Sequence, residues 1–99
     1  MRSPEVSRVP QHHHAVYAIS VAAELVSMQV QNLRVYERHG LVSPARTEGG
    51  TRRYSQADLD RLHRVRELLE EGLNLAGIAH VLRLEAEIAR LRGGDAPRR

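Results

Sequence analysis

The sequence has no cysteine, phenylalanine, tryptophan or lysine, and its only aromatic residues besides histidine are three tyrosines. Without cysteine the chain can form neither a disulfide nor a thiolate metal site. With so few aromatic side chains, Leu, Val, Ile and Ala must fill the interior, and a chain of 99 residues buries a modest share of its surface. We therefore expect one domain that gains further burial by pairing with a second copy.

Long apolar runs are also missing. No stretch approaches the roughly 18 residues that span a bilayer, and the N-terminus lacks the apolar core of a secretory signal. We expect a cytoplasmic, nucleoid-associated protein with no membrane partner.

Nothing in the sequence indicates catalysis or a bound cofactor. No nucleophile accompanies the six histidines, and consecutive histidines in a polar, proline-containing segment do not preorganise a metal site. We therefore expect no enzymatic activity, no cofactor and no metal at His12, His13, His14, His39, His63 or His80.

Positive charge is concentrated in one segment. The chain has 15 basic and 12 acidic residues, a formal charge of +3. Residues 34–53 contain five arginines and two glutamates, so this segment carries the whole formal excess. Such a patch favours a polyanionic partner.

Two short helices are predicted in the first half of the chain. Ser20 can cap a helix through Val26, and after a break at residues 27–29 a second helix runs from Val30 to His39. Gly40 is suited to end it in a left-handed conformation. Two short helices joined by a tight turn form a helix-turn-helix.

A β-hairpin, or wing, is predicted to follow. Its first strand begins at Leu41 and Val42, residues 48–50 reverse the chain, and residues 51–54 return as a strand. Arginines at the tip and on the return strand suit phosphate oxygens.

Two more helices are predicted in the second half. Residues 55–58 fit a capping box, followed by an apolar stripe at Leu59, Leu62, Val65, Leu68 and Leu69. Asn74 can cap the last helix, in which Leu75, Ile78 and Leu82 are candidates for the core. A short seam suited to pairing with a second copy follows at Val81, Leu84, Ile88 and Leu91.

The expected class is a mainly α protein: a winged helix-turn-helix with a small β-hairpin wing and a short C-terminal dimerisation helix. Residues 1–16 are expected to be a flexible arm, 17–83 the DNA-binding domain, 84–92 a short coiled-coil helix and 93–99 a flexible tail.

Individual side chains allow two interpretations. Arg34 and Arg38 could form a solvated face with nearby acids, but the arginine-bearing wing favours DNA binding. Tyr36 could pack against the core or donate to a phosphate, whereas Tyr54 is interpreted as apolar support for the wing.

Over residues 17–92 the chain resembles the MerR family of bacterial transcription regulators. The resemblance rests on Tyr17-Ala-Ile-Ser-Val-Ala-Ala-Glu-Leu, Asn32-Leu-Arg-Val-Tyr-Glu-Arg-His-Gly-Leu-Val and Gly50-Thr-Arg-Arg-Tyr-Ser-Gln-Ala-Asp-Leu. The strings Ile19-Ser-Val-Ala-Ala-Glu-Leu and Glu71-Gly-Leu-Asn-Leu-Ala-Gly-Ile are most similar to its HspR branch, the actinobacterial heat-shock repressors.

The resemblance implies a dimer joined through antiparallel C-terminal helices, with the second helix of each protomer in the major groove. It implies that DNA is contacted by Gln31, Arg34 and Tyr36 on that helix and by Arg46, Arg52 and the neighbouring Arg53 on the wing. It also implies repression of chaperone genes at inverted repeats, with a DnaK-type chaperone as co-repressor.

Some positions depart from the family pattern. Ser27 stands where glycine is usual, and Gln29 replaces a Ser or Thr cap. Val35 and Thr51 replace aromatic residues.

Two other functions fit part of the pattern. An excisionase-like or architectural DNA-binding accessory protein would use the same winged unit. A protein-interaction adaptor would use the fold without DNA, which the crowded arginines disfavour.

Overall fold

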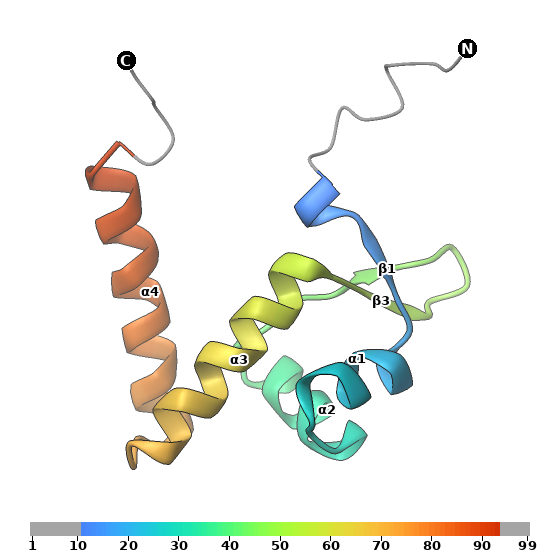
Figure 1. Cartoon of the computed structure of the whole chain (residues 1–99), viewed down its shortest axis with the longest axis horizontal. Helices are drawn as coiled ribbons and strands as arrows, with labels where there is room; N and C mark the ends of the chain where they lie inside the picture. The colour runs from blue at the N-terminus through green and yellow to red at the C-terminus, as the bar shows by residue number, and fades with distance from the viewer. Residues whose placement is uncertain (1–10, 94–99) are drawn as a thin grey trace.

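The computed structural model describes residues 11–93, in which four α-helices pack around one core beside a small sheet (Figure 1). The elements in chain order are a 3-10 helix (η2, Gln11–His13), β1 (Ala15–Tyr17), α1 (Ile19–Val26), α2 (Val30–Arg38), β2 (Ala45–Arg46), β3 (Arg52–Ser55), α3 (Gln56–Glu70) and α4 (Leu75–Leu91). This architecture confirms the predicted fold class. None of the helices in this part of the chain is long and apolar enough to cross a membrane.

The helix-turn-helix is formed by α1 and α2, but α1 starts before the predicted cap. Its N-cap is Ala18, whose carbonyl accepts the amide of Ala22 at 2.9 Å, and no side chain caps it. Ser20 therefore lies inside the first turn, and its predicted capping role is wrong. Gln29 also caps α2 without a side-chain hydrogen bond, as expected of a poor capping residue.

The turn between these helices places Ser27 in the left-handed region, at φ 56°. It is the only non-glycine residue with positive φ among residues 11–93. The Arg66 guanidinium on α3 donates to the Val26 and Ser27 carbonyls, and so holds the end of α1. The side chain at position 27 nevertheless bears the steric conflict that glycine avoids.

We therefore expect Ser27→Gly to raise the free energy of unfolding by about 0.5–1 kcal/mol. Relief of about 1–2 kcal/mol of left-handed strain exceeds the cost of a more flexible unfolded chain. Ser20→Gly, the same change inside α1, is the matched control and should lower stability by about 0.5 kcal/mol. Urea unfolding measures both variants. A Ser27→Gly variant no more stable than wild type would contradict the assignment of strain.

After α2 the chain turns at Gly40, whose φ of 76° confirms the predicted helix end. Leu41 and Val42 do not begin the wing as predicted, because both are buried in the core. The first strand of the wing is instead β2, in which Ala45 pairs with Arg53 and Arg46 with Arg52. Apolar burial of Leu41 and Val42 thus moves the start of the first strand from residue 41 to residue 45, a shift of four residues.

The hairpin belongs to a three-stranded antiparallel sheet in the order β1-β3-β2. The expectation of a flexible arm over residues 1–16 is wrong for Ala15 and Val16, because β1 pairs with β3: Ala15 pairs with Ser55, and Tyr17, the first residue of the predicted domain, pairs with Tyr54. Residues 1–10 and 94–99, in the predicted arm and tail, lie outside the described residues.

The core is built by the packing of α3 against the helix-turn-helix and the sheet. Ser55 caps α3 and forms the predicted capping box with Asp58. Buried apolar residues come from all four helices, β3 and the segment after α2: Ala22, Ala23, Val26, Leu33, Tyr36, Leu41, Val42, Tyr54, Leu59, Leu62, Val65, Leu68, Ile78 and Leu82.

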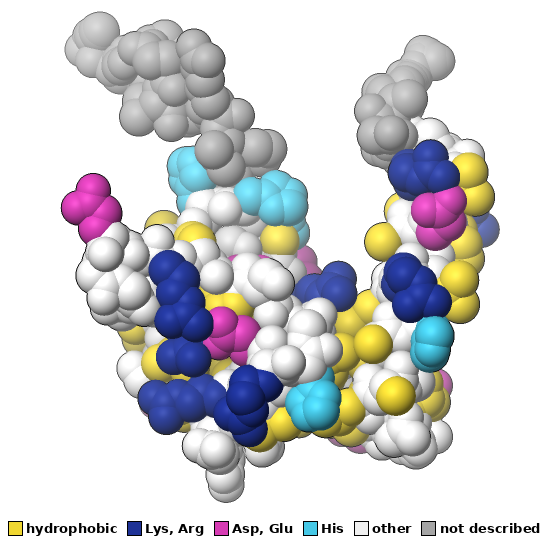
Figure 2. Space-filling view, turned by 180° about the vertical axis from the view of Figure 1, so that it is seen from behind, with side chains coloured by type: hydrophobic (Ala, Val, Ile, Leu, Met, Phe, Trp, Pro, Cys, Tyr) yellow, Lys and Arg dark blue, Asp and Glu magenta, His cyan; other side chains and the backbone are white. Residues whose placement is uncertain are grey.

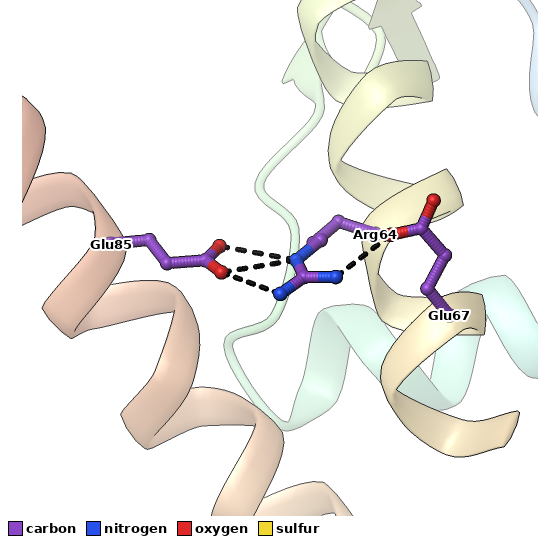
Figure 3. A network of polar contacts seen from close by, with 3 residues as sticks. All are labelled: Arg64, Glu67 and Glu85. Atoms are coloured by element: carbon purple, nitrogen blue, oxygen red, sulfur yellow. Dashed lines mark hydrogen bonds and ion pairs between the residues drawn. The ribbon is translucent and has the colours of Figure 1, made fainter. Parts of the chain in front are cut away.

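The last helix, α4, is capped by Asn74 as predicted. It contributes Ile78 and Leu82 to the core, and the predicted boundary at 83/84 lies inside this continuous helix. One turn farther, Glu85 accepts hydrogen bonds from Arg64 on α3, the shortest of 2.6 Å, and Arg64 also binds Glu67 at 2.8 Å (Figure 3). This network ties α4 to α3 where α4 leaves the core.

Candidate nucleic-acid interface

The second helix of the helix-turn-helix, α2, has one buried and one exposed side. Leu33 and Tyr36 are its buried residues. The exposed side contains Gln31, Arg34 and Arg38. Within residues 11–93 neither Arg34 nor Arg38 is part of an ion pair. The core therefore anchors this helix while its cationic side remains available to a ligand.

The wing is joined to α2 by a single carboxylate. Glu37 Oε2 accepts from Arg46 Nη2 at 2.7 Å, and Glu37 Oε1 accepts from Arg52 Nε at 2.5 Å. Two arginines that the resemblance assigns to DNA contact thus converge on one residue of α2. Figure 2 shows basic side chains in a band beside the wing, with an acidic side chain against them.

This cluster stays charged at neutral pH. Burial acts to raise the pKa of Glu37, but the hydrogen bonds and charges of Arg52 and Arg46 outweigh it and hold the pKa below its usual value. The same carboxylate raises the pKa of Arg52. Two guanidinium groups and one carboxylate leave one net positive charge.

The third predicted wing residue, Arg53, does not join this cluster. Successive side chains of a strand point to opposite faces, so Arg53 projects from the other face of β3 than Arg52. Its Nη1 donates to the Arg52 carbonyl at 3.3 Å, and it is partly buried.

Tyr36 and Tyr54 are packing residues. Tyr36 is only 8% exposed, and burial raises its pKa although Arg66 opposes the shift. The packing interpretation therefore holds for its ring, whereas donation of its hydroxyl to a phosphate stays a prediction from the family resemblance. Tyr54 is fully buried, which confirms it as apolar support for the wing.

Two residues of this surface, Arg38 and Glu37, are not among the contacts that the family resemblance implies. Arg38 is exposed one turn beyond Arg34 on α2. Its spacing of four residues from Arg34 is the sequence feature that places both on one side of the helix. From the sequence, Glu37 is one of the acids beside Arg34 and Arg38, and its link to the wing depends on how the hairpin docks.

The predicted dimerisation residues divide into two groups. Val81 packs against the core of its own domain. Leu84, Ile88 and Leu91 are 54%, 48% and 68% exposed. Apolar side chains are visible along the α4 arm in Figure 2. The exposed apolar seam therefore begins after the part of α4 that belongs to the core.

Comparison with known proteins identifies this arrangement. Residues 17–85 match the family model described as MerR HTH family regulatory protein. The heat shock protein HspR of Streptomyces coelicolor is 51% identical over 82 residues, covering 82% of this chain and 54% of the relative. The HTH-type transcriptional regulator GlnR of Bacillus anthracis is 42% identical over 67 residues, 68% of this chain and 52% of the relative.

A solved structure of a DNA complex shares the fold. It is HiNmlR, a MerR family regulator lacking the sensor domain, bound to promoter DNA, with a TM-score of 0.62 and 32% identity. The match covers 66% of this chain and 52% of that chain. The chain spans about half the length of these relatives. It belongs to the MerR family of helix-turn-helix regulatory proteins, which are DNA-binding transcriptional regulators rather than enzymes.

Proposed function

We propose that the chain is a homodimeric repressor of heat-shock and chaperone genes that binds an inverted repeat in double-stranded DNA. In this proposal α2 is the reading helix: it enters the major groove with Gln31 and Arg34 toward base edges, while the wing contacts the flanking phosphates. The observation that carries it is the joining of the exposed cationic side of α2 to the arginines of the wing through Glu37. The likeness to HspR supports the heat-shock assignment.

Pairing of two copies through α4 is part of this proposal. Leu84, Ile88 and Leu91 recur at spacings of four and three, the pattern of a helix-helix seam. A two-fold axis through this seam relates two reading helices, and an inverted repeat has the same symmetry.

A DnaK-type chaperone as co-repressor stays a prediction from the family resemblance. Its addition to a DNA-binding reaction is expected to extend protection of the operator to lower protein concentrations. No change in protection with added chaperone would contradict the partnership and leave the repressor proposal intact.

Footprinting on the DNA upstream of the chain's own gene tests DNA binding. Arg34→Ala and Arg52→Ala are each expected to weaken binding by about 10–100-fold, because each removes a charged contact to DNA. Increasing salt should weaken wild-type binding steeply, since several phosphates are neutralised.

The matched control is Arg83→Ala, which removes the same charge from the exposed surface of α4, away from the reading helix. It should protect the site as well as wild type does. The proposal fails if wild type protects no specific site, or if both interface variants bind like wild type.

A further inference from the structure

We infer that Glu37 is a positioning residue of the DNA interface, which fixes the wing against α2 and orients Arg52 toward a phosphate. This inference rests on the proposed DNA binding. A carboxylate alone would repel the DNA phosphates. In this inference Glu37 nevertheless favours binding. It also gives the two arginines that share this carboxylate different tasks.

The guanidinium of Arg52 uses one of its three nitrogens to bind Glu37. Its Nε is taken by Glu37 Oε1 at 2.5 Å, whereas Nη1 and Nη2 make no hydrogen bond to any residue from 11 to 93. The two Nη groups of a guanidinium can bind a phosphate in bidentate fashion. Glu37 therefore fixes the Arg52 guanidinium through Nε and leaves the donors of both Nη groups for a phosphate of the DNA backbone.

Arg46 is used differently. Its Nη2 binds Glu37 Oε2 at 2.7 Å, and its Nη1 donates to the Gly50 carbonyl at 3.0 Å. Gly50 closes the turn of the wing through its amide, which donates to the Thr47 carbonyl at 2.9 Å. Arg46 thus connects the turn of the wing to α2, which makes it a structural link rather than the principal phosphate contact.

Charge and positioning predict opposite effects of losing this carboxylate. Glu37→Gln raises the charge of the interface by one, so electrostatics alone predicts tighter DNA binding. An amide oxygen cannot hold two guanidinium groups as an ionised carboxylate does. Loss of positioning therefore predicts weaker binding despite the added charge.

Glu48→Gln supplies the matched control. Glu48 is exposed at the turn of the wing and forms no ion pair with the described residues. Its replacement changes the charge of the wing by the same amount without touching Arg46 or Arg52. Binding is measured by fluorescence anisotropy with two probes: the duplex that wild type protects in the footprint, and a random-sequence duplex of equal length.

The expected result is that Glu37→Gln weakens binding to the protected duplex by about tenfold, the loss of about one charge-assisted hydrogen bond. Glu48→Gln should leave affinity unchanged or raise it by up to about threefold. If both variants bind more tightly by similar factors, Glu37 acts through charge alone and the inference is overturned.

Amide hydrogen exchange in the free protein gives a second readout that needs no DNA. The amides of Thr47, Gly50 and Thr51 donate hydrogen bonds within the wing. Their exchange should become at least about threefold faster in Glu37→Gln and stay unchanged in Glu48→Gln, because only the first releases the wing. Unchanged amide exchange in Glu37→Gln would overturn the claim that Glu37 fixes the wing against α2. If wild type protects no DNA site but the two variants still differ in exchange in this way, DNA binding is rejected and the role of Glu37 in fixing the wing is retained.

Discussion

Ile88→Glu is expected to make the protein monomeric at micromolar concentration and to lower its affinity for the inverted repeat by about 10²–10⁴-fold. Leu84, Ile88 and Leu91 are large apolar side chains that α4 leaves about half exposed or more. Burial of the part that is still exposed contributes about 1–2 kcal/mol per side chain, since complete burial of such a side chain contributes about 1.5–3 kcal/mol. A carboxylate among them must lose its hydration when the seam closes.

The loss of DNA affinity follows from the loss of pairing. In a dimer, binding of the first half-site brings the second reading helix to its own half-site at a high effective concentration. A monomer retains only one set of contacts. Since glutamate is a good helix former, α4 should remain helical, which circular dichroism can verify.

Ala86→Glu is the control for charge on α4. Residue 86 lies two positions from both Leu84 and Ile88, so it does not share their face of the helix, and it is exposed. This variant should remain dimeric. Sedimentation equilibrium gives the mass of each species. A dimeric Ile88→Glu variant, or a wild-type monomer that protects both half-sites, would show that the seam is not where two copies pair.

Local features of this fold could be predicted from the sequence because neighbouring residues specify them. The capping box of Ser55 and Asp58 and the Asn74 cap each satisfy helix amides that lie three residues away. The glycine that ends α2 adopts the left-handed conformation expected from its position. Apolar spacing along α3 identified four of its buried residues, Leu59, Leu62, Val65 and Leu68.

Features that depend on distant pairing could not be predicted in this way. Strand β1 has three residues, too few for an alternating pattern, and becomes a strand because it meets β3 far along the chain. The bridge from Glu37 to Arg46 and Arg52 spans nine and fifteen residues and exists only after the wing docks on α2. Tyr36 illustrates the same limit, since spacing on α2 allowed either side of the helix.

Leu33→Ala is expected to lower the free energy of unfolding by about 2–5 kcal/mol, a large share of the roughly 5–15 kcal/mol of a typical domain. Leu33 is fully buried, and it and Tyr36 are the buried residues of α2. Truncation leaves a cavity between α2 and the rest of the core. The reading helix should therefore loosen and DNA binding fall, although no DNA-facing side chain has changed.

Arg34→Ala distinguishes the effect of core packing from the effect of DNA contact, because Arg34 follows Leu33 directly but is exposed. Arg34 is exposed and forms no ion pair with the described residues. The Arg34→Ala variant should therefore change the free energy of unfolding by no more than about 0.5 kcal/mol. Urea unfolding at one fixed protein concentration compares the variants, since the stability of a dimer depends on concentration. If Leu33→Ala and Arg34→Ala destabilise the protein equally, Arg34 is a structural residue. The weaker DNA binding of Arg34→Ala would then result from unfolding. A loss below about 1 kcal/mol in Leu33→Ala would show that other contacts hold α2 in place.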